Sequence, residues 1–194
     1  GGLLRTLDTR AAGNLDWSPD GRRIVYVDAL NQGTLRLLDL ETGVDTLFEA
    51  RRATQPRFSP DGKNIAYAVS DAVGLQVYIA SVDGSQSARI SIEVDLHRKP
   101  MWSQTSSTLF VEGANRGIHS IYRVPMDASG LVQLGPGEVV HEPWMFIDEW
   151  DLGPDDTMYL VGLPLTDDGF AGSTVLDVTV NWFEQLKRLA PPSQ

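Results

Sequence analysis

The pentapeptide Trp17–Gly21, with the sequence Trp-Ser-Pro-Asp-Gly, returns as Phe58–Gly62, with the sequence Phe-Ser-Pro-Asp-Gly. A degraded third copy is Trp102–Ser106, and a fainter fourth is Leu152–Asp156. Successive copies begin 41, 44 and 50 residues apart. Periods in this range are typical of one supersecondary unit that is stacked several times, because a single unit cannot bury its own apolar faces. The repeat therefore favours a fold built from copies of one small sheet.

Each copy of the pentapeptide predicts a tight turn between two strands. Proline presets φ at the first central position, aspartate can bond the backbone two residues on, and glycine accepts a positive φ. In the first two copies a basic residue and a short apolar run follow, Ile24–Val27 and Ile65–Ala68. The aromatic residue before the turn ends one strand and the apolar run begins the next, so each copy is interpreted as a hairpin corner.

The spacing between corners accommodates four strands in each unit. The predicted strands of the first unit are one that ends at Trp17, then Arg23–Asp28, Thr34–Leu40 and Asp45–Phe48. Those of the second are Thr54–Phe58, Asn64–Ser70, Leu75–Ser81 and Ala88–Glu93. Those of the third are Pro100–Trp102, Thr108–Glu112, Ser120–Pro125 and Leu131–Leu134, with a longer loop at Gly113–Gly117.

The fourth unit departs from this plan. Its first strand lies within the long segment Gly137–Trp150, the next two are Met158–Leu163 and Val175–Val180, and no fourth strand follows. Residues 181–189 instead have the cap spacing of a short helix, an Asn with a Glu three residues later. A spare strand, Leu3–Leu7, precedes the first corner, and adding it to the last unit would close a ring and protect both free edges.

The sequence therefore predicts an all-β fold, a β-propeller of about four four-stranded blades, with residues 1–194 as a single domain. The predicted blades span approximately 13–50, 54–94, 98–137 and 144–180, with 3–7 as the closing outer strand.

Composition excludes several functional classes. The chain has 194 residues, of which 42% are hydrophobic and 22% charged, as in an ordinary globular protein. It lacks an apolar run of about 20 residues, so insertion into a membrane is not expected. The absence of cysteine excludes thiol nucleophiles and thiolate zinc sites. A formal net charge of −10 argues against nucleic-acid binding, which usually needs a basic stripe.

The four-stranded units and their Trp/Phe-Ser-Pro-Asp-Gly corners resemble the TolB-like, WD-repeat-like β-propellers of bacteria. The resemblance covers nearly the whole chain and is most specific in the first two units. The ending Val180–Leu189 is similar to that of bacterial chains in which such a propeller follows a serine/threonine kinase or a winged-helix DNA-binding domain. The resemblance implies a sensory or scaffolding role in signalling.

The number of units departs from that family, whose propellers usually have six or more blades. Two copies related by a two-fold axis would make eight blades, with Leu3–Leu7 of each chain completing the last sheet of the other. An isolated four-bladed ring or open half is a second possibility, and a fragment of a longer chain is a third. The compartment, cytoplasmic or periplasmic, stays open.

The sequence contains no recognisable catalytic motif. It lacks a Gly-x-Ser-x-Gly elbow, a phosphate-binding glycine loop and a His-Glu-x-x-His pair. The histidines at 97, 119 and 141 do not follow the repeat, and the acidic residues between 148 and 168 match no calcium loop. We therefore expect no enzyme activity, no metal and no cofactor.

A ligand, if one binds, is expected at the mouth of the axial channel, which the first strand of each blade lines. The residues placed there are Asn14, Asp16, Gln55, Arg57, Arg98, Lys99, Asp148 and Glu149. The basic run His97–Lys99 could receive an acidic peptide or small anion, or be an ordinary exposed loop. The aromatic segment Trp144–Trp150 could be a contact surface or could pack in the core. The candidate partner contacts are His97, Arg98, Lys99, Arg57, Asp148, Glu149 and Trp144.

The preferred interpretation is a non-catalytic module that binds a protein or peptide and forms a homodimer. The alternative is the accessory propeller of a prolyl-oligopeptidase-like hydrolase, or a lyase that acts in its own channel.

Overall fold

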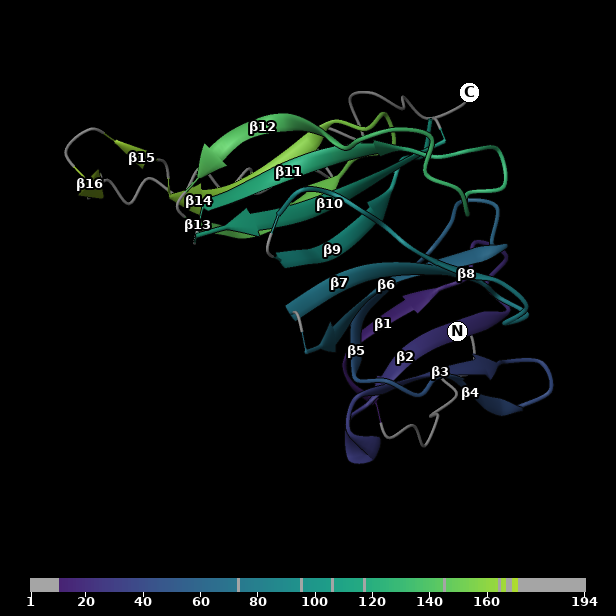
Figure 1. The fold of residues 1–194 in the computed structure, drawn as a ribbon. Helices are drawn as coiled ribbons and strands as arrows, with labels where there is room; N and C mark the ends of the chain where they lie inside the picture. Colours follow the sequence, from purple (N-terminus) through teal and green to yellow (C-terminus); the bar gives the residue numbers. More distant parts are fainter. Residues whose placement is uncertain are drawn as a thin grey trace, which may run out of the picture.

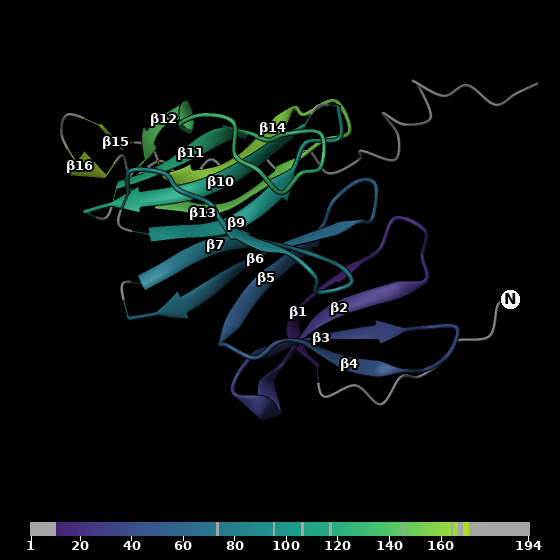
Figure 2. The same cartoon turned by 45° about the vertical axis from the view of Figure 1, so that its right-hand side comes forward.

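The computed structural model describes residues 11–72, 74–94, 96–105, 107–116, 118–144, 146–163, 165–166 and 169–170. Apart from one turn of 3₁₀ helix at Ala29–Asn31, the regular elements within these residues are strands paired in antiparallel sheets. Figures 1 and 2 show the sheets stacked face to face in chain order, like neighbouring wedges. The all-β propeller prediction is thereby confirmed.

Three sheets have four strands each, and in each sheet every strand pairs with its neighbour in the chain. The first sheet comprises β1 (Ala11–Trp17), β2 (Arg23–Asp28), β3 (Thr34–Asp39) and β4 (Asp45–Glu49). The second comprises β5 (Ala53–Phe58), β6 (Asn64–Asp71), β7 (Gly74–Ser81) and β8 (Ser87–Arg89). The third comprises β9 (Leu96–Trp102), β10 (Thr108–Asn115), β11 (Ile118–Pro125) and β12 (Glu138–Trp144). A fourth sheet is described as the pair β13 (Phe146–Leu152) and β14 (Met158–Leu163), and β15 (Leu165–Thr166) pairs with β16 (Gly169–Phe170).

The hydrophobic core lies between the sheets. Because side chains alternate along a strand, β6 sends Ile65 and Tyr67 into a cluster shared with the first sheet, and Ala66 and Ala68 into one shared with the third. A smaller cluster joins Phe110 of the third sheet to the fourth. Both faces of an internal sheet are therefore buried, which explains the continuous apolar runs in the second strands.

The repeated pentapeptide forms the corner that its sequence predicts. In the first copy the Ser18 hydroxyl donates to Asp20 Oδ1 at 2.6 Å, Arg23 N donates to Ser18 Oγ at 2.8 Å, and Gly21 has φ of 70°. That φ is in the left-handed region, where glycine is favoured. The second copy repeats these contacts with Ser59, Asp61, Gly62 and Asn64.

The predicted outer strand of the third sheet is wrong. Leu131–Leu134 lies in a tight loop closed by hydrogen bonds from Gly130 N and Val132 N to the Asp127 backbone and side chain. The outer strand is instead β12, which lies in the segment predicted as the approach of the fourth unit. Both segments contain two adjacent apolar residues, Val139–Val140 in β12 and Leu131–Val132 in the loop, so pattern alone could not decide which of them pairs with β11.

Two other boundaries differ from the prediction. β8 ends at Arg89, although Ile90 N still donates to Val77 O, and the Ser91 backbone then pairs with the side-chain amide of Gln133. The predicted loop at 113–117 is mostly strand, since β10 continues to Asn115, opposite Ile118. The predicted strands 3–7 and 175–180 and the helix 181–189 lie outside the described residues.

The degraded third corner receives its carboxylate from the fourth. Thr105 occupies the place of Asp20, and the Ser103 hydroxyl donates instead to Asp156 Oδ2 at 2.6 Å. Gln104 N donates to Asp156 Oδ1 at 2.9 Å, and the Thr105 hydroxyl also donates to Asp156. Burial raises the pKa of Asp156, but these hydrogen bonds outweigh it and hold the pKa below its usual range. The carboxylate thus ties the fourth sheet to the third.

We expect Asp156→Gly to lower the free energy of unfolding by about 1–3 kcal/mol, because it leaves the polar groups of the third corner without their shared acceptor. Glycine suits the φ of 61° at this position, so backbone strain does not contribute. Adding Thr105→Asp should restore most of the loss by recreating the corner of the first two copies. Urea unfolding of the three proteins checks this, and a double variant no more stable than Asp156→Gly would contradict it.

Candidate interaction surfaces

The first strands of the sheets are tied to one another near the predicted channel mouth. β5 lies beside both β1 and β9. Each of β5 and β9 contains a bulge in which a residue with positive φ, Gln55 or Lys99, precedes a proline. Lys99 N donates to Gln55 Oε1 at 2.9 Å. A positive φ is uncommon outside glycine, so the repeated bulge is a specific device that brings neighbouring strands together.

The position before each corner aromatic residue forms a second link between sheets. In the first sheet this is Asp16, whose Oδ2 accepts Phe58 N at 2.8 Å. Burial raises the pKa of this carboxyl above its usual range, although the bond to Phe58 opposes the rise. In the second sheet it is Arg57, whose Nε donates to Met101 Sδ at 3.4 Å. Arg57 therefore bridges two sheets and is only partly available to a partner.

Arg98 belongs to a charged cluster on the face of the third sheet toward the fourth. Its Nε and Nη2 donate to Glu112 Oε1 at 2.9 and 2.7 Å, and His119 Nδ1 donates to the same oxygen at 2.7 Å. Glu112 is only 2% exposed. The corresponding positions in the first and second sheets are Val27 and Ala68, so this carboxylate is an exception to an apolar pattern.

His97 is buried and does not face a partner. Its Nε2 lies 3.1 Å from Ile92 O and 3.2 Å from Val94 O, and therefore carries the hydrogen. Burial lowers the pKa of His97 below its usual range, which keeps the ring neutral. His97 fixes the connection between the second and third sheets.

The predicted basic run His97–Lys99 is therefore not one exposed patch. It lies in β9, and Lys99 Nζ stands 5.8 Å from the ring centre of Trp150. Asp148 and Glu149 are in β13 and Trp144 ends β12, but their side chains lie outside what the structure describes. Within the described residues no group of three or more His, Asp or Glu side chains is arranged to hold a metal ion.

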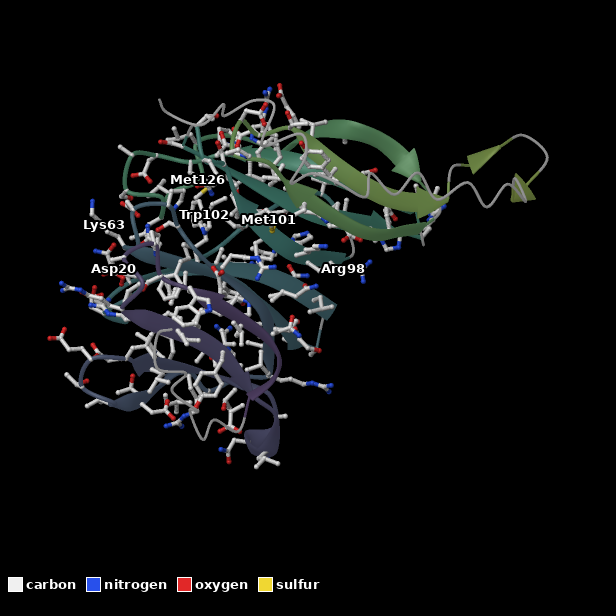
Figure 3. All side chains as sticks on the ribbon, turned by 180° about the vertical axis from the view of Figure 1, so that it is seen from behind. Asp20, Lys63, Arg98, Met101, Trp102 and Met126 are labelled. Atoms are coloured by element: carbon white, nitrogen blue, oxygen red, sulfur yellow. The ribbon has the colours of Figure 1, made fainter. Side chains whose placement is uncertain are left out.

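The first sheet turns apolar side chains away from the second sheet, and among the described residues no sheet precedes it. Ile24, Tyr26 and Leu38 on this outward face are buried, whereas the residues of β1 on it are exposed. Trp17 is 53% exposed, whereas Phe58 and Trp102 at the same place in the next corners are 6% and 7% exposed. Figure 3 shows Trp102 beside Met126, in the cluster shared by the second and third sheets. Leu15 on the same face as Trp17 is also exposed. The sheet thus presents residues whose repeats are buried against a preceding sheet.

The outward face of the fourth sheet, as far as the structure describes it, is also exposed. Tyr159 is 61% exposed, while its equivalent in the first sheet, Val25, is fully buried against the second. Asp151 is paired with Tyr159 in register, as Asp16 is with Val25, and is also exposed. Among the described residues the first and fourth sheets are the outermost of the row, and their outward faces are of the kind that bind neighbouring sheets internally.

Comparison with known proteins agrees with this architecture. The sequence model of PD40, described as the TolB beta propeller domain, matches residues 14–146. The chain belongs to the TolB β-propeller family. TolB from Acinetobacter baumannii superposes with a TM-score of 0.63 at 23% identity over 86% of this chain and 40% of its own. The putative TolB from Agrobacterium tumefaciens gives 0.56 at 22% identity over 76% of this chain and 57% of its own.

One curated relative carries the name of a peptidase. The uncharacterized peptidase YuxL of Bacillus subtilis is 31% identical over 106 residues, which is 49% of this chain and 16% of the relative. This TolB-family chain therefore matches only a small part of that protein.

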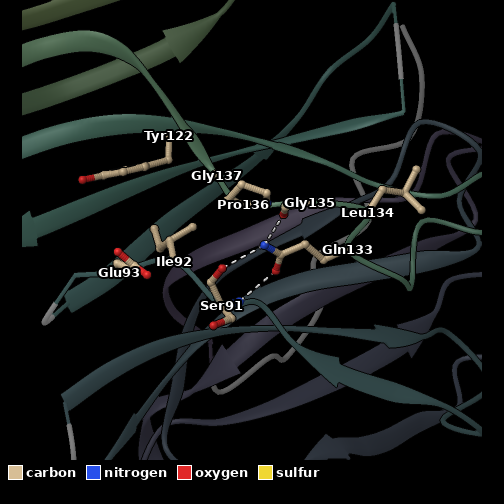
Figure 4. Close-up of a pocket in the computed structure, with 9 residues that line it drawn as sticks. All are labelled: Ser91, Ile92, Glu93, Tyr122, Gln133, Leu134, Gly135, Pro136 and Gly137. Carbon is tan, nitrogen blue, oxygen red and sulfur yellow. Dashed lines mark hydrogen bonds between the residues drawn. The ribbon is translucent and has the colours of Figure 1, made fainter.

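The rim of this TolB-like propeller has a groove of about 730 Å³ between the second and third sheets (Figure 4). The Gln133 side-chain amide crosses it, accepting from Ser91 N at 2.9 Å and donating to Ser91 O at 2.8 Å. None of the seven predicted contact residues lines it. Gln133 pairs the outward backbone groups of Ser91, which protects this part of the edge.

Among the described residues, no helix has the length and apolarity needed to cross a bilayer.

Sequence reasoning placed the contact residues at the channel mouth. It implied that an open half would expose two blade faces, but it did not name Trp17, Tyr159 or Asp151 as contacts. The repeat itself contained the information needed to predict a contact surface on the first sheet. The first corner carries an aromatic residue like the next two, yet no sheet precedes it among the described residues, so the repeat points to Trp17 as a contact residue.

Proposed function

We propose that this propeller is a non-catalytic protein-interaction and scaffolding module that associates with a second copy of itself by closing a ring. The observation that carries the proposal is the exposure of Trp17, at a position where the repeats bury the aromatic ring. Soluble monomers rarely expose large contiguous apolar patches. Propellers protect their free edges by closing a ring, and a two-fold axis would place each open end of one copy against the other.

Light scattering during size-exclusion chromatography tests the self-association. We expect the wild-type chain to have twice the mass of one chain, and Trp17→Ser to have the mass of one. Val132→Ser is the matched control, because Val132 is equally exposed but lies on the loop before β12. A wild-type chain that stays a folded monomer at high concentration would contradict self-association. The exposed face would then be expected to bind another protein or another part of a longer chain.

The alternative function is that of an accessory propeller to a hydrolase, or a lyase with a site in its channel. The name of the Bacillus relative favours the first. The second requires convergent titratable groups, and Arg98 and His119 both lie within hydrogen-bond reach of Glu112. Glu112 is enclosed between two sheets, however, and is saturated on one oxygen by these donors. We expect no labelling of the purified chain by a fluorophosphonate serine-hydrolase probe, and labelling would favour the alternative.

A further inference from the structure

We propose that the fourth sheet of one copy docks on the first sheet of the other, and that the Asp151 carboxylate accepts the Trp17 backbone N–H across this interface. The inference rests on the proposed self-association and names the residues that would make it. The second copy is the occupant because the two free faces together reproduce a contact that the chain already makes internally.

The internal contact joins Asp16 of the first sheet to the backbone of Phe58 in the second, at 2.8 Å. Ser59 N donates to Asn64 O within the second sheet, so the preceding amide, that of Phe58, points away from β6 and toward the first sheet. Ser18 N makes the same bond to Arg23 O at 2.9 Å. The Trp17 amide is therefore directed away from β2, as the amide of Phe58 is from β6, and it also interacts with the Asp16 carboxylate of its own strand.

Asp151 occupies in the fourth sheet the place that Asp16 occupies in the first, immediately before the corner. It is opposite Tyr159 in the ladder, on the face away from Met158, which packs toward the third sheet. Its Oδ1 accepts Leu152 N at 2.9 Å. In the third sheet the equivalent residue is Met101, which has no carboxylate that could accept the Leu152 N–H. Asp151 is thus an exposed acceptor on the open side of the array.

The apolar groups around the two polar ones also match. Trp17 and Leu15 are exposed on the first sheet, and Tyr159 is exposed on the fourth. Their internal equivalents, Phe58 and Val25, meet in one buried cluster. A hydrogen bond from a backbone N–H to a carboxylate is stronger than one between two neutral groups. A second copy therefore satisfies both the polar and the apolar parts of each free face.

The test combines dimer affinity with hydrogen exchange of two backbone amides. Asp151→Ala should raise the dimer Kd by about tenfold to a hundredfold, and Asp151→Asn, which keeps an acceptor oxygen, should recover most of the affinity. Glu41→Ala, an exposed acid at the corner between β3 and β4, is the control and should leave Kd unchanged. In the wild-type dimer the Trp17 amide should be protected from exchange and should lose protection in Asp151→Ala, while the Phe58 amide should be protected in every variant.

The outcomes separate this inference from the proposed function. A wild-type dimer with an unprotected Trp17 amide, or an Asp151→Ala dimer of unchanged Kd, would overturn the pairing while leaving self-association intact. A wild-type monomer would overturn both. Loss of dimer in Asp151→Ala with restoration in Asp151→Asn, together with the change at the Trp17 amide alone, supports the pairing, because a general loss of fold would also expose Phe58.

Discussion

Trp102→Ala is expected to lower the free energy of unfolding by about 3–5 kcal/mol, the range for removing a large aromatic side chain from a packed core. Trp102 is buried in the cluster that includes Ile79, Leu109 and Met126. Its Nε1 also donates to Arg57 O at 3.2 Å, so the substitution would remove a link between two sheets as well as apolar contact. Urea unfolding followed by circular dichroism at low protein concentration measures the loss.

The matched control is Trp17→Ala, which changes the same residue at the same place in the first corner. Because Trp17 is half-exposed in a single chain, we expect a loss of about 1 kcal/mol or less in the dilute protein. The same substitution should weaken the proposed dimer strongly. Equal losses of stability for the two variants would show that the first sheet is covered within one chain, contrary to the exposed face described above.

The corners could be predicted from sequence because their chemistry is local. Ser18, Asp20 and Gly21 satisfy one another within five residues, so the turn forms wherever that pattern occurs. The strands beside the corners followed from continuous apolar runs, since an internal sheet is buried on both faces. The prediction of repeated four-stranded sheets therefore needed no information about distant contacts.

The features that the sequence did not predict depend on residues far apart in the chain. The third corner lacks its own aspartate, and nothing near it indicates that Asp156 supplies the carboxylate. After the short strand β8, the Ser91 backbone pairs with Gln133, a residue more than forty positions later in the chain. His97 belongs to a basic run in the sequence, but alternation in β9 turns it inward and Arg98 to the opposite face. Local composition describes neither the partner nor the burial of such groups.

Arg98→Ala is expected to cost about 3 kcal/mol, because it removes the main counter-ion of a carboxylate that is enclosed between two sheets. Arg98 donates twice to Glu112 Oε1, and His119 is the other donor to that oxygen. The Arg98 side chain is itself partly exposed, which places the loss at the lower end of the range for breaking a buried pair. Urea unfolding near neutral pH gives the comparison.

Replacing both partners distinguishes the cost of an isolated charge from the value of the pair. In Arg98→Met/Glu112→Val no carboxylate is left buried, and valine is the residue that the first sheet carries at the place of Glu112. Apolar replacements of buried ion pairs are often neutral or stabilising. We therefore expect the double variant to unfold within about 1 kcal/mol of the wild type. A double variant as unstable as Arg98→Ala would mean that the pair itself, through its geometry between the third and fourth sheets, contributes to the stability of their contact.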